Sequence, residues 1–406
     1  MTESVGGSYF HAVGSKPLMG VPIDTFLGEV IRRQPDREAL VVVSQGVRWT
    51  YRELDVQVQR VARSLIALGI KRRDRVGIWA TNSVQWVLLQ LATARVGAVL
   101  VNVNPAYRAT ELAHALRLAE VDTLVLMPAF RDSHYIDIVR GLCPEVHDRP
   151  AEAFQAASLP LLRRLVVFDP ERADGDPKTR PCPGFGLWSE LLAAGDSVSD
   201  ADVQIRSATL DADDPINIQF TSGTTGAPKA VLLTHHNILN NGYSCGEGLG
   251  LTPDDRLCVP VPLYHCFGMV VGTLTAFAHG ATAVLPSPHF DAPATVAALV
   301  EESCTVIHGV PTMFIALLDE ASRQGVRLPA LRTGIMAGAP CPPELLRRVM
   351  APDGLGCAEI LVGYGQTEAS PVTHLTRPDD SLERRTETVG TSLPFQEAKI
   401  IDPETG

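Results

Sequence analysis

The segment RVGIWATNSVQWVLLQLATARVGAVLVNV, residues 75–103, determines the fold class. An apolar run at 75–80 is followed by a helical pattern at 84–96 and a second apolar run at 98–103. We expect a strand at each run and a helix between them. Continuously apolar strands that are joined through a helix are typical of a parallel sheet covered on both faces.

The alternation of strands and helices continues on both sides of this segment. A short apolar strand is expected at 38–43, and Thr50 and Glu53 form a capping-box pattern that begins a helix. A helix at 109–118 and a strand at 123–127 follow. Further apolar strands are predicted at 257–261, 283–285, 306–310 and 360–362. The chain is therefore expected to be an α/β protein.

Residues 145–212 interrupt this rhythm and carry several prolines: Pro150, Pro160, Pro170, Pro177, Pro181 and Pro183. Proline-rich, polar segments are typical of surface excursions. We therefore predict one α/β unit over 1–212 and a second over 213–380.

Composition excludes several classes of protein. The 406 residues contain 35 Lys and Arg against 46 Asp and Glu, a net charge of −11, which argues against a nucleic acid partner or an anionic lipid surface. Eight cysteines without a CxxC pair argue against a disulfide framework and a zinc ribbon. The N-terminus lacks a signal-peptide pattern, and the apolar run at 269–286 is too short to span a bilayer. We expect a cytoplasmic protein without a transmembrane segment.

The stretch FTSGTTGAPKAV, residues 220–231, is a candidate phosphate-binding loop between two strands. Glycines and small hydroxyl residues let N–H and O–H groups converge on phosphate oxygens, and Lys229 adds a positive charge. It is not a Walker A loop, because Pro228 replaces the second glycine and Ala230 replaces the Ser or Thr that binds Mg²⁺. A metal would need another ligand. The alternative is a flexible hairpin.

Two further stretches follow apolar strands. GYGQTEASP, residues 363–371, places an aromatic ring, a hydroxyl and a carboxylate at the carboxyl end of a strand, where open α/β sheets bind ligands. Its Glu368 would supply the metal ligand that the glycine loop lacks. AGAP, residues 337–340, offers a flat wall that is poor in side chains.

Together these stretches resemble the adenylate-forming superfamily, over essentially the whole chain. TSGTTGAPK (221–229) and GYGQTE (363–368) resemble its two signatures. PLYHCFGM (262–269), GVPTMF (309–314) and NVNPAYRATEL (102–112) resemble acyl-CoA synthetases for medium- or longer-chain fatty acids. The resemblance implies the large N-terminal body of such an enzyme, with two αβαβα-type subdomains, the start of a β-barrel subdomain at 381–406, and no C-terminal lid domain.

The implied reaction joins a fatty carboxylate to ATP as acyl-AMP and then transfers the acyl group to coenzyme A or to a carrier-protein thiol. The implied cofactors are ATP, Mg²⁺ and coenzyme A, and the chain could form a homodimer. Residues 262–269 contain no acidic side chain, whereas amino-acid-activating relatives typically carry an aspartate near this stretch. A plain fatty or aryl carboxylate is therefore favoured over an amino acid.

The resemblance also implies roles for individual residues. Those expected to hold the ATP phosphates are Thr221, Ser222, Gly223, Thr224, Thr225, Gly226 and Lys229. Tyr364 would stack on adenine beside Gly338, Ala339 and Pro340. Thr367 would bond the α-phosphate, and Glu368 would hold Mg²⁺. The acyl pocket would be lined by His265, Val310, Met313 and Gly365. The catalytic set is then Lys229, Thr367, Glu368 and His265.

Two departures from the family pattern have consequences. Ala230 stands where the family commonly has glycine. The sequence ends at Gly406, before the family's ribose-binding aspartate, hinge and catalytic lid lysine. This predicts weak binding of ATP or acyl-adenylate and slow turnover.

Two alternatives remain open at this point. One is a non-catalytic fragment that binds an acyl group or a nucleotide. The other is a serine hydrolase, because residues 242–246 match G-x-S-x-G around Ser244.

Overall fold

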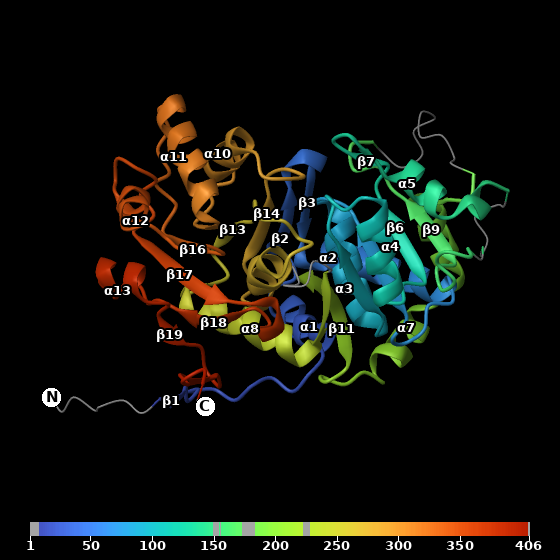
Figure 1. The fold of residues 1–406 in the computed structure, drawn as a ribbon, viewed down its shortest axis with the longest axis horizontal. Coiled ribbons are helices and arrows are strands. Elements are labelled where there is room, and N and C mark those ends of the chain that lie inside the picture. The colour runs from blue at the N-terminus through green and yellow to red at the C-terminus, as the bar shows by residue number, and fades with distance from the viewer. Residues whose placement is uncertain (1–7, 149–153, 155, 173–182, 222–227, 405–406) are drawn as a thin grey trace.

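The computed structural model describes residues 8–148, 154, 156–172, 183–221 and 228–404. Two large sheets lie side by side and are covered by helices (Figure 1). We call the seven-stranded one sheet I and the nine-stranded one sheet II. Buried residues of both sheets belong to one hydrophobic cluster, which includes Ile78 and Leu124 of sheet I and Leu257 and Leu361 of sheet II.

Sheet I contains both strands of the segment 75–103. In spatial order its strands are β10 (Gly186–Leu187), β9 (Arg164–Val167), β6 (Thr123–Leu126), β4 (Arg75–Trp79), β5 (Val99–Val103), β11 (Pro215–Thr221) and β12 (Lys229–Thr234). All neighbours pair in parallel except β11 and β12, which form an antiparallel hairpin. The predicted parallel sheet is confirmed.

The predicted helices of this half are also confirmed. They are α2 (Tyr51–Ala67), α3 (Val84–Val96) and α4 (Ala109–Leu118). At the start of α2, Thr50 Oγ1 accepts a hydrogen bond from the Glu53 N–H, and the Glu53 carboxylate accepts one from the Thr50 N–H. This reciprocal pair satisfies two N–H groups that a helix start would otherwise leave without partners.

Sheet II is larger and mostly parallel. In spatial order its strands are β19 (Thr391–Ser392), β18 (Val372–Leu375), β17 (Glu359–Gly365), β16 (Thr333–Ala337), β15 (Val306–Gly309), β13 (Arg256–Cys258), β14 (Thr282–Leu285), β2 (Glu38–Val42) and β3 (Val47–Thr50). Its other main elements are α1 (Ile23–Arg33), α8 (His235–Gly248), a π-helical segment (Phe267–Leu274), α9 (Thr275–Ala278), α10 (Ala292–Glu301), α11 (Pro311–Gln324), α12 (Pro343–Met350) and α13 (Leu382–Glu387).

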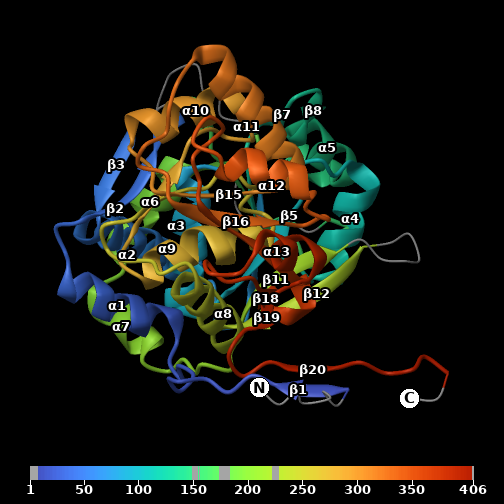
Figure 2. The same ribbon diagram turned by 90° about the vertical axis from the view of Figure 1, so that its left-hand side faces the viewer.

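The remaining short elements lie around these two layers. They are β1 (Tyr9–His11), β7 (Ala129–Phe130), β8 (Ser133–His134), α5 (Tyr135–Leu142), α6 (Trp188–Ala194), α7 (Asp200–Ser207), β20 (Glu397–Lys399) and the 3₁₀ segments Val43–Gln45, Pro144–Asp148, Gly195–Ser197 and Thr367–Ala369. Strands β1 and β20 pair antiparallel, which brings the two ends of the described chain together (Figure 2).

Residues 145–212 are more than the predicted surface excursions. They supply β9, which pairs with β6 inside sheet I, together with β10, α6 and α7. Strand β9 is short, and Pro160 and Pro170 lie close to its two ends. Nearby prolines indicate a loop, so the sequence pattern did not predict this strand. Its apolar side chains Leu165, Val166 and Val167 are nevertheless buried.

The sheets do not follow the predicted boundary between residues 212 and 213. Strands β2 and β3 lie in sheet II, where β2 pairs with β14, whereas β11 and β12 lie in sheet I, where β11 pairs with β5. Each predicted unit therefore contributes strands to both sheets. Within 381–406, β19 extends sheet II and β20 pairs with β1, so the start of a separate β-barrel subdomain stays a prediction.

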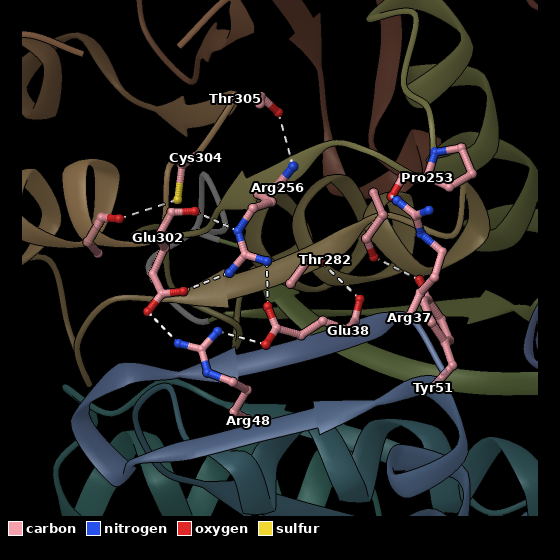
Figure 3. Close-up of polar contacts among 12 residues, drawn as sticks. Arg37, Glu38, Arg48, Tyr51, Pro253, Arg256, Thr282, Glu302, Cys304 and Thr305 are labelled. Atoms are coloured by element: carbon pink, nitrogen blue, oxygen red, sulfur yellow. Dashed lines mark hydrogen bonds and ion pairs between the residues drawn. The ribbon is translucent and has the colours of Figure 1, made fainter. Parts of the chain in front are cut away.

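An ion-pair network joins three strands of sheet II to the end of α10 (Figure 3). Arg48 Nη1 and Nη2 lie 2.7 Å from Glu38 Oε1 and 2.7 Å from Glu302 Oε1. Arg256 binds the same two carboxylates from the other side, at 2.7 Å from Glu302 Oε2. Burial by itself would raise the pKa of Glu38, but hydrogen bonds from Arg48 and Arg256 hold it below its usual value. Since every charge is matched, the network is structural.

Two predictions drawn from composition can be checked directly. The seven cysteines within the described ranges are all free thiols. Among the same residues, no helix has both the length and the apolar character that crossing a membrane requires.

Candidate functional site

The carboxyl ends of β15, β16 and β17 meet at one edge of sheet II. Gly309 pairs with Met336, and Ala337 pairs with Gly363. Val310 and Gly338 follow β15 and β16 directly, and Tyr364 is the last residue but one of β17, so the three are neighbours along that edge. The sequence analysis expected AGAP and GYGQTEASP to follow apolar strands, with ligand binding at the carboxyl end of the strand before GYGQTEASP.

The AGAP stretch forms an open wall at this edge. Gly338 has a φ of +85°, in the left-handed region that favours glycine. A Cβ atom built there would lie 3.2 Å from Val310 Cγ1. Gly338, Ala339 and Pro340 are exposed to solvent. A planar ligand would therefore meet backbone and small side chains here.

Tyr364 stands beside this wall with 55% of its surface exposed. Its backbone is fixed by pairing with His374 on β18, and the Thr373 hydroxyl donates a hydrogen bond to its carbonyl oxygen at 3.3 Å. The ring lies edge-on to His374, with a centroid separation of 6.1 Å. The backbone is therefore held while a large part of the ring remains open for stacking.

A tight turn after Tyr364 presents the hydroxyl and carboxylate of the second motif. A Cβ atom at Gly365 would lie 1.9 Å from the Pro371 carbonyl oxygen, so only glycine fits. The Gln366 N–H donates to that same oxygen at 2.9 Å, and the Ser370 N–H donates to the Thr367 carbonyl oxygen at 3.1 Å. The closed turn places Thr367 and Glu368 at the same edge of the sheet as Tyr364.

The phosphate-loop hairpin of sheet I reaches this turn. Thr221 and Lys229 face each other across the last β11–β12 pair, and β12 contacts the turn at Thr367–Ala369. The Thr221 hydroxyl donates to Glu368 Oε1 at 3.4 Å, which joins the two motifs across 147 residues. Lys229 is exposed. The predicted phosphate ligands Ser222, Gly223, Thr224, Thr225 and Gly226 lie outside the described residues.

His265 lies two residues before the π-helical segment, next to Cys266, whose sulfur contacts the Thr367 hydroxyl. Its Nδ1 accepts a hydrogen bond from the Phe267 N–H at 3.1 Å. Desolvation lowers the pKa of His265, although its surface is partly open to solvent, so the ring is neutral at pH 7. A neutral ring whose Nδ1 accepts carries its proton on Nε2, which is then available to a ligand.

Val310 and Met313, predicted for the acyl pocket, are half-buried at the start of α11. The Met313 N–H donates to the Val310 carbonyl oxygen at 2.9 Å. Both side chains pack against the main hydrophobic cluster. Gly365 is exposed. The lining of an acyl pocket by these residues stays a prediction.

The carboxylate and hydroxyl of Glu368 and Thr221 fit a magnesium ion. Mg²⁺ is bound through one or two carboxylates and substrate phosphates, with water completing the shell. Within the described ranges no three His, Cys, Asp or Glu side chains cluster as a metal site built from protein alone would require. Glu368 is exposed at the phosphate-loop hairpin, which suits a metal that arrives with a nucleotide.

The hydrolase alternative at Ser244 is wrong. A nucleophile elbow needs a strand immediately before the serine and a helix after it. Ser244 instead lies inside α8, as the tenth residue of a helix that begins at His235. The G-x-S-x-G match reflects glycines that pack in a helix: a Cβ at Gly246 would lie 2.2 Å from a ring carbon of His279.

Three supporting residues were missed by the sequence analysis. Cys266 Sγ lies 3.5 Å from Thr367 Oγ1. The Asn241 side chain pairs with both backbone groups of Val372, at 2.7 and 3.1 Å. His114 Nε2 lies 3.2 Å from the Pro228 carbonyl oxygen, next to Lys229. Only Cys266 had a signal, its position beside His265 in a recognised motif.

Comparisons with known proteins identify the family of this chain. The family described as AMP-binding enzyme matches residues 27–406. The zebrafish (Danio rerio) protein named medium-chain acyl-CoA ligase ACSF2, mitochondrial, is 42% identical over 98% of this chain, and the chain spans 64% of that relative's length. The protein YngI of Bacillus subtilis (strain 168) is 42% identical over 94% of this chain and 68% of its own length.

A solved structure supports the fold. The N-terminal domain of FACL13 from Mycobacterium tuberculosis superimposes with a TM-score of 0.72, at 23% identity, over 92% of this chain and 82% of that one. The α/β fold is thus that of the N-terminal body of adenylate-forming enzymes, as predicted. With its two signatures joined at one sheet edge, the chain belongs to the AMP-binding enzyme family.

Proposed function

We propose that this chain is the ATP- and acyl-binding body of an acid–thiol ligase that activates a fatty carboxylic acid of medium or longer chain. The observation that carries the proposal is the contact between the two motifs, in which the Thr221 hydroxyl meets the Glu368 carboxylate at 3.4 Å. Family membership and the relative named as a medium-chain acyl-CoA ligase support it.

In the first step a carboxylate oxygen attacks the α-phosphorus of ATP, the bond to the bridging oxygen breaks, and pyrophosphate leaves. Negative charge on the transferred group is stabilised by fixed donors and cations. Lys229 and the Thr221 hydroxyl would bind the departing phosphates, and the Thr367 hydroxyl would bind the α-phosphate. Glu368 would hold Mg²⁺, which supplies charge neutralisation to the phosphates when bound.

In the second step a thiol sulfur attacks the acyl carbonyl carbon, and AMP departs with the phosphoanhydride oxygen. Coenzyme A is the favoured thiol because of the relative's name, and a carrier-protein thiol is the alternative. The neutral His265, with Nε2–H free, is suited to donate a hydrogen bond to the acyl carboxylate. Tyr364 and the Gly338–Pro340 wall would hold the adenine between a ring and bare backbone.

The test is carboxylate-dependent exchange of labelled pyrophosphate into ATP, measured with fatty acids of graded length. We expect exchange that needs a fatty acid and falls at least tenfold in Lys229→Ala. Lys71→Ala, at another exposed lysine, is the matched control and should change nothing. Nucleotide binding without exchange for any acid would instead identify the chain as a non-catalytic binder.

A further inference from the structure

Cys266, in the stretch PLYHCFGM (262–269), contacts Thr367 of the second signature. It is 1% exposed, and its Sγ lies 3.5 Å from Thr367 Oγ1 and 3.5 Å from His265 Nδ1. Thr367 is itself only 7% exposed. Within the described part of the chain, Cys266 is the hydrogen-bond partner of the Thr367 hydroxyl.

The direction of these hydrogen bonds follows from counting donors. Burial raises the pKa of the Cys266 thiol to about 11, so the sulfur carries its proton at neutral pH. That single S–H proton has two acceptors within reach, His265 Nδ1 and Thr367 Oγ1. The histidine nitrogen already accepts from the Phe267 N–H at 3.1 Å. Because His265 Nδ1 has one lone pair and already uses it, we assign the thiol as donor and the threonine oxygen as acceptor.

A hydroxyl that accepts from Cys266 keeps its own proton free. A threonine side chain has one O–H donor and two acceptor lone pairs. With one lone pair occupied by the thiol, the O–H proton is left for a ligand at the turn, where the neighbouring Gln366 and Glu368 are exposed. We propose that Cys266 is a positioning residue that orients the Thr367 hydroxyl as a donor to the α-phosphate of a bound adenylate. This inference rests on the proposed function.

The experiment compares binding of AMP with binding of adenosine, which lacks the phosphate, by calorimetric titration of the full chain. Loss of a single hydrogen bond's alignment corresponds to about 3- to 10-fold in affinity. We expect Cys266→Ala to lower the affinity for AMP by that factor and to change the affinity for adenosine by no more than about twofold. Cys266→Ser, which keeps a donor and an acceptor, should restore most of the AMP affinity.

A double-mutant cycle separates positioning from packing. Thr367→Ala should lower the affinity for AMP. Adding Cys266→Ala to that variant should lower the affinity no further, because the thiol acts only through the Thr367 hydroxyl. Cys357→Ala is the matched control, since Cys357 is also fully buried but lies near the start of β17, away from the site. If Cys266→Ala does not fold, Cys266→Val fills the volume without hydrogen bonding and takes its place.

The outcomes distinguish this inference from the proposed function. Equal weakening of AMP and adenosine, or additive losses in the double variant, would overturn the positioning role and leave the proposed function standing. Unchanged AMP affinity in Cys266→Ala would do the same. Failure of the unaltered chain to bind AMP at all would overturn both.

Discussion

Replacing Tyr364 with alanine should remove adenine stacking while leaving the fold intact. The ring is 55% exposed, and its described aromatic contact is the edge-on His374 at 6.1 Å. An edge-to-face pair contributes about 0.5–1.5 kcal/mol, so the free energy of unfolding should fall by about 1.5 kcal/mol at most. Thermal unfolding of the variant should therefore remain close to that of the unaltered chain.

The binding loss should be larger than the stability loss. Stacking of a base on an aromatic side chain contributes about 1–3 kcal/mol, which is roughly 5- to 150-fold in affinity. We would titrate Tyr364→Ala calorimetrically with an acyl-sulfamoyl adenosine, a non-hydrolysable analogue of acyl-AMP. Tyr364→Phe should bind like the unaltered chain, because stacking needs the ring and not the hydroxyl.

Tyr9→Ala provides the matched control, since Tyr9 is 54% exposed and lies on β1, outside the candidate site. We expect no change in affinity for that variant. Equal affinities for Tyr364→Ala and the unaltered chain would refute the placement of adenine at the carboxyl end of β17. So would a loss of the same size in Tyr9→Ala.

Three further predictions concern stability. In Gly365→Ala the added Cβ would collide with the Pro371 carbonyl oxygen at 1.9 Å, so the free energy of unfolding in chemical denaturation should fall by about 1–3 kcal/mol. An unchanged denaturation midpoint would contradict the tight turn described after Tyr364. Arg256→Met leaves two partly buried carboxylates with one arginine fewer and should cost about 2–3 kcal/mol, whereas Arg52→Met, at an exposed pair, should cost under about 0.5 kcal/mol. Burial lowers the pKa of His235 from 6.5 to about 4, so between these values the unfolded state binds the extra proton and stability falls as pH falls. His235→Asn removes that proton site. Between pH 8 and pH 5 the free energy of unfolding of the variant should therefore fall by about 2 kcal/mol less than that of the unaltered chain. Identical pH profiles of stability would show that His235 is not the group responsible.

The sequence predicted those parts of the fold that local pattern specifies. The unit β4–α3–β5 was found within one residue at its ends, because continuous apolar strands and a helical repeat are contained in 29 residues, 75–103. The capping box at Thr50 was found for the same reason. The positions of AGAP and GYGQTEASP after strands were predicted because each follows an apolar run, and open α/β sheets bind ligands at the carboxyl ends of their strands.

Features that depend on distant partners escaped prediction. The pairing of β2 with β14 joins segments more than 200 residues apart, for example Leu40 with Ala283. The sequence of neither strand specifies which strand it pairs with. The contact between Cys266 and Thr367 spans 101 residues. Strand β9 was hidden by flanking prolines. These are consequences of packing, which pattern alone does not specify.

The most direct test of the central claim is titration of the unaltered chain with acyl-sulfamoyl adenosines whose acyl groups increase in length. Each buried CH₂ contributes roughly 0.8 kcal/mol, so affinity should rise about fourfold per carbon until the pocket is filled. The account predicts saturable binding that climbs from adenosine to a medium or longer acyl chain and then levels off or falls. Binding that is absent, or that does not depend on acyl length, would contradict an acyl-activating site.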